Sequence, residues 1–64
     1  MTDFPQKLKI IRQTKRITQK QLAEKTHISR SSIAMYETGK TVPSQETLKH
    51  IAECLGVSVE HFMR

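Results

Sequence analysis

The fold of this chain is decided by residues 18–40, TQKQLAEKTHISRSSIAMYETGK. Leu22 and Ala23 come first, and Ile33 and Tyr36 follow after a short break, each pair placed for one face of a helix. Ala23 is small, as is needed where two short helices cross steeply and approach closely. The stretch therefore predicts two short helices joined by a tight turn.

The break between these two helices has the features of a turn. His27 occupies the turn, Ile28 fills the corner between the helices, and Ser29 supplies a hydroxyl that caps the second helix. This spacing is that of a helix-turn-helix motif of the kind that reads DNA. We place the motif at about residues 19–38.

Helix starts elsewhere in the chain share one arrangement. A hydroxyl residue at the cap follows an apolar residue or a proline, and a second apolar residue comes four positions beyond the cap, as in a hydrophobic staple. The caps are Thr18, Ser29, Ser44 and Ser58. An apolar stripe predicts a first helix over about residues 4–15, and a short last helix is expected over about residues 59–63. We therefore expect an all-α, compact five-helix domain over residues 1–64, with the motif at helices two and three.

The composition limits the chain to one small domain with a modest core. It has 64 residues, of which 36% are hydrophobic. The net charge of +5 and the isoelectric point near 9.8 favour a polyanionic partner. One cysteine cannot form an intrachain disulfide, and no apolar run approaches the ~20 residues that span a bilayer. We expect a cytoplasmic protein with no membrane partner.

Residues that carry chemistry in other proteins form no recognisable site here. The three histidines match no common zinc-ligand spacing, and the sequence has no nucleophile–base pair or phosphate-cradling glycine loop. Cys54 is expected to be a small, partly buried residue, with an intermolecular redox switch as the alternative. Phe4, Tyr36 and Phe62 fall on apolar stripes, which favours core positions over a base-stacking platform. We expect neither an enzyme nor a bound metal or cofactor.

Three segments of the chain resemble the lambda-repressor-like, Cro/XRE-type helix-turn-helix family. They are LKIIR from residue 8, ITQKQLAEKTHISRSSIAMYETGKTVP from residue 17 and LKHIAECLGVSVEHF from residue 48. The resemblance runs from about Leu8 to Phe62, with several motifs in the same order and spacing. The chain departs from the family pattern at His27, where glycine is usual. A non-glycine residue with positive φ costs of order 1 kcal/mol, so strain or a shift is expected in this turn.

The second helix of the motif turns four candidate base-reading residues outward or to its flank when its apolar residues are buried. In the docking mode that the resemblance implies, its N-terminal part enters the major groove. Arg30 is expected to make a bidentate contact to guanine, the alternatives being a solvated surface arginine or a phosphate contact. Ser31 is expected at a base edge or a phosphate, and Ala34 and Met35 against a thymine methyl group.

The resemblance also implies contacts to the DNA backbone. Gln19 opens the first helix of the motif at a position that bonds a phosphate in this family, beside that helix's free amides. Further phosphate contacts are expected of Ser29, Ser32, Thr38, Lys40 and Thr41. For Ser29, the role of a plain helix cap is the stronger expectation, and the phosphate contact is the alternative.

Two further roles come from the resemblance. It implies that Arg12 pairs with Glu37 and joins the first helix to the end of the recognition helix, against the alternative of a free surface arginine. It also implies a dimer contact near the corner between the last two helices. The candidates there are Val57, Val59, His61 and Met63, although the two valines can instead simply complete the core.

These features predict a sequence-specific regulator of transcription that binds double-stranded DNA, and a repressor is the simplest form. One module makes few contacts, so we expect a homodimer on a pseudo-palindromic operator with half-sites roughly 34 Å apart. The alternative is an antitoxin-like protein-binding module with autoregulatory DNA binding. A regulatory protein partner is also left open, because so short a chain has no room for a small-molecule sensor domain.

Overall fold

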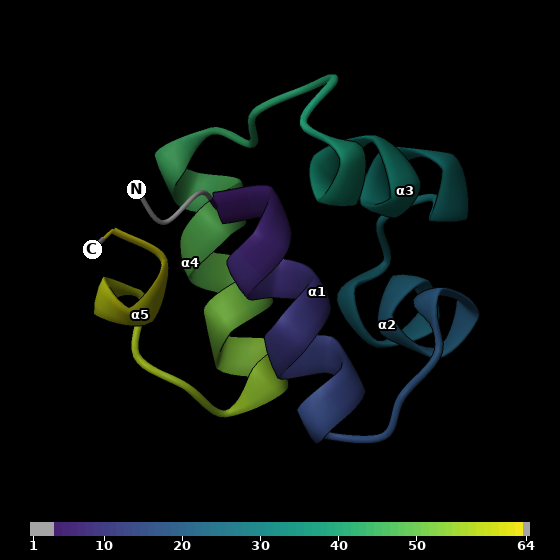
Figure 1. Cartoon of the computed structure of the whole chain (residues 1–64), viewed down its shortest axis with the longest axis horizontal. Helices are drawn as coiled ribbons and strands as arrows, with labels where there is room; N and C mark the ends of the chain where they lie inside the picture. Colours follow the sequence, from purple (N-terminus) through teal and green to yellow (C-terminus); the bar gives the residue numbers. More distant parts are fainter. Residues whose placement is uncertain (1–3, 64) are drawn as a thin grey trace.

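The computed structural model describes residues 4–63 and consists, over that range, of five helices joined by short loops (Figure 1). The helices are α1 (Phe4–Thr14), α2 (Gln19–Thr26), α3 (Arg30–Thr38), α4 (Gln45–Leu55) and α5 (Glu60–Met63). The predicted all-α, five-helix architecture is therefore confirmed, with the helix-turn-helix motif at α2 and α3.

Three of the four predicted caps act as N-caps. The hydroxyls of Thr18, Ser29 and Ser44 each accept a hydrogen bond from the backbone N–H three residues on, at 3.0, 3.1 and 3.2 Å. At α2 the side chain of Gln21 accepts in return from the cap's own N–H at 2.8 Å, which completes a capping box. The hydroxyl of Ser58 accepts from the N–H two residues on, at 3.2 Å. α5 consequently begins at residue 60, one residue later than predicted.

α1 ends at Thr14, one residue before the predicted end. The cause is Arg16, whose φ of 60° lies in the left-handed region. This conformation lets the Ile17 N–H reach the carbonyl of Arg12 at 3.2 Å, while the Arg16 N–H reaches the carbonyl of Gln13 at 2.9 Å. Such a pair of bonds is the Schellman ending of a helix, which glycine usually provides.

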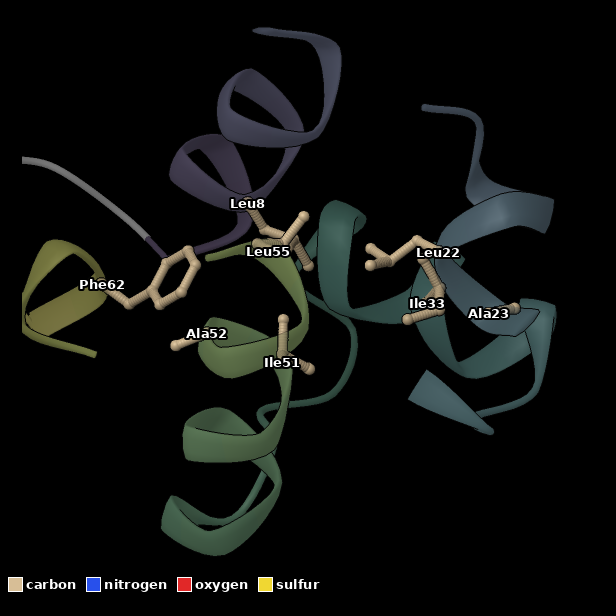
Figure 2. Close-up of a cluster of buried hydrophobic side chains, with 8 residues drawn as sticks. All are labelled: Leu8, Leu22, Ala23, Ile33, Ile51, Ala52, Leu55 and Phe62. Atoms are coloured by element: carbon tan, nitrogen blue, oxygen red, sulfur yellow. The ribbon is translucent and has the colours of Figure 1, made fainter. Parts of the chain in front are cut away.

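One hydrophobic core holds the five helices together, and every helix contributes to it (Figure 2). The buried side chains are Leu8 of α1, Leu22 and Ala23 of α2, Ile33 of α3, Ile51, Ala52 and Leu55 of α4, and Phe62 of α5. Phe4 lies edge-on to both Tyr36 and Phe62, with ring centroids 6.5 and 5.3 Å apart. The three aromatic residues therefore belong to the core region, as their apolar stripes predicted.

α1 and α4 form the centre of the molecule, with α5 on one side and α2 and α3 on the other (Figure 1). α1 packs against both α3 and α5, and α2 packs against both α3 and α4. The inner side of α3 is thus covered by α1 and α2, whereas Arg30, Ser31 and Thr38 on its other sides are exposed. This arrangement leaves α3 with one long face open to solvent.

Candidate nucleic-acid interface

α3 is fixed in length because both of its ends are capped. Ser29 caps the first turn from an extended conformation, with φ −64° and ψ 148°. At the other end Gly39 has a φ of 80°, and its N–H and that of Lys40 both bond to the carbonyl of Met35. Any side chain at this glycine is strained by the left-handed conformation and also meets the ring of Pro5 at 3.4 Å. The start and the end of α3 are therefore set by residues outside its open face.

The open face of α3 carries the four residues that were predicted to read bases. Arg30 and Ser31 are exposed, Met35 is 37% exposed, and Ala34 is half-buried. Residues three and four apart are neighbours on a helix, so Ser31, Ala34 and Met35 form one continuous strip. Arg30 flanks this strip at the N-terminal end of α3.

Hydroxyl and basic residues border this strip. The hydroxyl of Ser29 donates to that of Ser32 at 2.9 Å and also accepts from the Ser32 N–H. The hydroxyl of Thr38 bonds back to a carbonyl of its own helix at 3.1 Å. Lys40 and Thr41 are exposed in the loop that follows α3. Because both bonds of the Ser29 hydroxyl stay within the helix start, its role as a cap is the one that the structure supports directly.

Gln19 opens α2, as expected, but its side chain is directed toward the protein. Nε2 donates a hydrogen bond to Oε1 of Glu37 at 3.1 Å, and the residue is half-buried. A glutamine amide has two N–H donors, of which this bond uses one. In this position Gln19 can donate to a phosphate through the second N–H, and the α2 backbone offers the unpaired amides of its first turn.

Arg12 and Glu37 form the ion pair that the resemblance implies. Arg12 Nε and Nη2 lie 2.6 and 3.2 Å from the two carboxylate oxygens, and Nη1 donates to the carbonyl of Ile17 at 2.8 Å. The two side chains are 12% and 3% exposed. Within residues 4–63 every buried side-chain N or O atom has a hydrogen-bond partner. Arg12 therefore links α1 to α3 and adds no free charge to the open face.

His27 ends α2 in the left-handed conformation that was anticipated for this turn, with φ 59° and ψ 28°. Next to it, Thr26 is buried, and its hydroxyl bonds to the carbonyl of Leu22 at 2.8 Å. His50 of α4 lies 2.7 Å from the Thr26 carbonyl through Nε2, which must donate because a carbonyl only accepts. The sequence did not predict this contact, because the two residues are 24 positions apart and no local pattern marks them.

The four candidate dimer residues lie between the end of α4 and the end of α5. Val57 and Val59 are partly buried and pack against the core. His61 is exposed and lines a shallow hollow with residues of α1. Met63 is the last residue of α5, and its side chain lies outside what the structure describes. The valines thus complete the core, which is the alternative that the sequence left open for them.

The described residues include neither a membrane-spanning helix nor a metal-binding cluster. Among residues 4–63, no helix combines the length and the apolar character needed to cross a membrane. The same residues contain no group of three or more His, Cys, Asp or Glu side chains placed to hold a metal ion. Cys54 is half-buried on α4, with its sulfur 3.5 Å from the carbonyl of Lys25.

Comparison with known proteins gives a consistent result. The family model for the helix-turn-helix matches residues 8–62. The transcriptional activator BcrR of Enterococcus faecalis is 38% identical over 61 residues, which cover 95% of this chain and 30% of that protein. The immunity repressor protein of Bacillus phage phi105 is 44% identical over 54 residues, covering 84% of this chain and 38% of the repressor.

A third relative is the HTH-type transcriptional regulator YqaE of Bacillus subtilis (strain 168). It is 34% identical over 61 residues, which cover 95% of this chain and 53% of YqaE. The chain therefore spans between 30% and 53% of the length of these three relatives. No solved structure matched the chain.

Proposed function

We propose a function from one premise: the chain belongs to the lambda-repressor-like, Cro/XRE-type family of helix-turn-helix proteins. The protein is a sequence-specific regulator of transcription that acts in the cytoplasm, as a homodimeric repressor on double-stranded DNA. The observation that carries this proposal is the open face of α3. Its exposed Arg30, Ser31 and Met35 lie between hydroxyl and basic residues, on a helix whose other side is buried.

The reading of bases is assigned to this face. An α-helix with its side chains is ~10–12 Å across and fits the ~12 Å major groove. Arg30 makes a bidentate contact to guanine O6 and N7, which is worth about 1–3 kcal/mol of discrimination against another base. Ser31 bonds to a base edge or a phosphate, and Ala34 and Met35 pack against a thymine methyl group.

Contacts to the phosphates hold the helix in the groove. Lys40 and Thr41 are supported in this role by their exposure in the loop that directly follows α3. Thr38 and Ser32 border the same face, and Ser29 contributes chiefly as the cap of α3. Gln19 donates its second N–H to a phosphate at the start of α2, beside the unpaired backbone amides there.

Dimerisation follows from the small number of contacts that one module can make. Two copies on a pseudo-palindrome, with half-sites roughly 34 Å apart, double the set of base and phosphate contacts. The interface is assigned to the segment from Val57 to Met63, in which His61 is exposed and Val57 and Val59, although they pack against the core, are only partly buried. A repressor is supported by the phi105 relative, which is an immunity repressor protein. Because BcrR carries the name of an activator, a promoter assay is needed to test the sign of regulation.

Selection of duplex DNA from a random library tests the proposal. The wild type is expected to yield a palindromic consensus with a guanine in each half-site, and Arg30→Ala is expected to lose that guanine. Lys49→Ala is the matched control, because it also removes an exposed cation. Lys49 belongs to α4, not α3, and lines a hollow with Val59, which directly precedes α5. It should give the wild-type consensus.

The outcomes of the selection are distinct. A consensus that Arg30→Ala leaves unchanged would limit Arg30 to a phosphate contact and move base reading to Ser31, Ala34 and Met35. If no consensus emerges, and binding only weakens as salt is added, the specific regulator is wrong and the antitoxin-like protein-binding module becomes the better explanation.

A further inference from the structure

Val42, in the loop between α3 and α4, is an unusually exposed aliphatic residue. Its side chain is 80% exposed. Among the described residues, the other exposed large hydrophobic side chains are Ile10 at 57% and Met35 at 37%. Ile10 belongs to α1, whereas Met35 lies on the open face of α3, only seven positions before Val42. Two of these three side chains thus lie at the C-terminal end of the recognition helix or just after it.

The loop that carries Val42 is anchored on both sides. Before it, the left-handed Gly39 ends α3, and the Lys40 N–H bonds to the carbonyl of Met35 at 3.0 Å. After it, Pro43 is buried, and the next residue caps α4. Figure 1 shows this loop arching outward from the end of α3 before it reaches α4. The protein therefore holds Val42 in solvent by a short connection fixed at both ends.

The loop also touches the open face of α3. The hydroxyl of Thr41 lies 3.9 Å from the sulfur of Met35, within the reach of a weak hydrogen bond to sulfur. The loop that carries Val42 therefore meets the open face of α3 at Met35, the last residue of the strip. The strip is polar at its start, with Arg30 and Ser31, and apolar at its end.

The charge around Val42 suits a polyanion. Residues 38–44, TGKTVPS, contain one cation, Lys40, and no acidic residue. In the major groove of duplex DNA, the apolar group that a base pair presents is the 5-methyl group of thymine, close to the phosphates of its own strand. An aliphatic side chain flanked by a lysine and a hydroxyl matches that combination of methyl group and phosphate.

We propose that Val42 is a further specificity-determining residue, which packs with Met35 against thymine methyl groups at one end of each half-site. This inference rests on the proposed function and names the base that the loop selects. Met35 is five positions after Arg30, which is ~7.5 Å along the helix. Base pairs are 3.4 Å apart, so the thymines lie about two or more steps from the guanine that Arg30 contacts.

Replacement of single thymines by deoxyuridine tests the proposal, because it removes only the methyl group. Each thymine in a wild-type consensus site is replaced in turn, and dissociation constants are measured for wild type, Val42→Ala and Met35→Ala. At one position the wild type is expected to lose about fourfold in affinity per half-site. At that position Val42→Ala is expected to lose most of this sensitivity, because the thymine methyl group keeps only its contact with Met35.

Ile10→Ala is the matched control, because it truncates another exposed aliphatic side chain on a different helix. It should keep the wild-type sensitivity to deoxyuridine, which is a ratio of two affinities and so does not depend on the strength of dimerisation near His61. Thermal unfolding of Val42→Ala should match wild type, since the side chain is mostly in solvent.

The inference is overturned if Val42→Ala retains the wild-type sensitivity to deoxyuridine at every position. It is also overturned if Met35→Ala alone removes that sensitivity everywhere, because Val42 then contacts no methyl group. Both outcomes leave the proposed function intact, since a consensus site has been found. Failure of the library selection to yield any consensus would instead contradict the proposed function itself.

Discussion

Gln19 and Glu37 are joined by a hydrogen bond of 3.1 Å that connects the first residue of α2 to the last turn of α3. The same carboxylate accepts two bonds from Arg12, so it receives three donors from two other helices. Glu37 is 3% exposed, and each of these donors replaces water that the carboxylate lost on burial. The placement of the recognition helix therefore depends on side chains that belong to α1 and α2.

A second carboxylate at position 19 should destabilise the domain. Gln19→Glu removes the donor to Glu37 and places two negative charges side by side, whereas Gln19→Ala removes only the hydrogen bond, at a cost of about 1 kcal/mol. We expect the Glu variant to lose more of the free energy of unfolding than the Ala variant, as measured by urea denaturation.

Gln45→Glu provides the matched control for this comparison. Like Gln19, Gln45 is the first residue of a helix and follows a hydroxyl cap, Ser44 in place of Thr18, but it is exposed. There a carboxylate should be neutral or stabilise by about 0.3–1 kcal/mol through the helix dipole. Equal effects of the two Glu substitutions would show that the contact with Glu37 is without consequence.

Removal of Arg12 should be severe because it leaves a buried carboxylate without its cation. Arg12→Met is expected to cost about 3–5 kcal/mol, the range for breaking one partner of a buried pair. The double variant Arg12→Met with Glu37→Gln should recover a large part of that loss, because no unpaired charge remains. Urea denaturation of both variants and of the single Glu37→Gln variant gives the coupling energy. A loss below ~1 kcal/mol for Arg12→Met would mean that the pair behaves like a surface salt bridge.

Glycine at the left-handed helix ends should stabilise the protein. His27 and Arg16 have φ values of 59° and 60°, which cost a residue with a β-carbon of order 1 kcal/mol. We expect His27→Gly and Arg16→Gly each to raise the free energy of unfolding by up to that amount. His27→Ala is the control and should not raise it, because alanine keeps the β-carbon. Thermal unfolding in which glycine and alanine behave alike would contradict the assignment of strain to these positions.

Loss of a phosphate contact should change affinity without changing sequence preference. Lys40→Ala is expected to weaken binding to all sequences about equally and to reduce the slope of log K against log salt by about 1. Titrations at several salt concentrations, on a consensus site and on a scrambled duplex, measure both effects. Lys49→Ala, which removes an exposed charge on the α5 side, should leave the slope unchanged. A Lys40→Ala variant that discriminates less between the two duplexes would instead indicate base reading by Lys40.

Local chemistry made much of the fold predictable. Thr18, Ser29 and Ser44 carry hydroxyls where helix N-termini need acceptors, so the starts of α2, α3 and α4 could be located from the sequence. The end of α1 was predicted one residue too late because Arg16 takes a conformation that its own side chain does not favour. A local pattern does not reveal that conformation, because a left-handed helix end is usually marked by glycine.

The site was predictable in its outline but less so in its hydrogen bonds. Helical periodicity is enough to turn Ser31 and Met35 away from the core. The bond of Gln19 to Glu37 joins residues 18 positions apart, and that of His50 to Thr26 joins residues 24 apart. Such contacts depend on how helices cross, which no local pattern records. The exposure of Val42 likewise depends on the path of a loop rather than on its composition.

The two caps of α3 have a consequence for how binding preference changes over evolution or in the laboratory. The start of α3 is set by Ser29 and its end by Gly39, while its inner side is set by Ile33 and Glu37. None of these four residues is assigned to base reading. The residues of the open face can therefore be substituted without altering the length or the position of the helix. Under the proposed function, substitutions on that face and at Val42 are therefore enough to give new operator preferences.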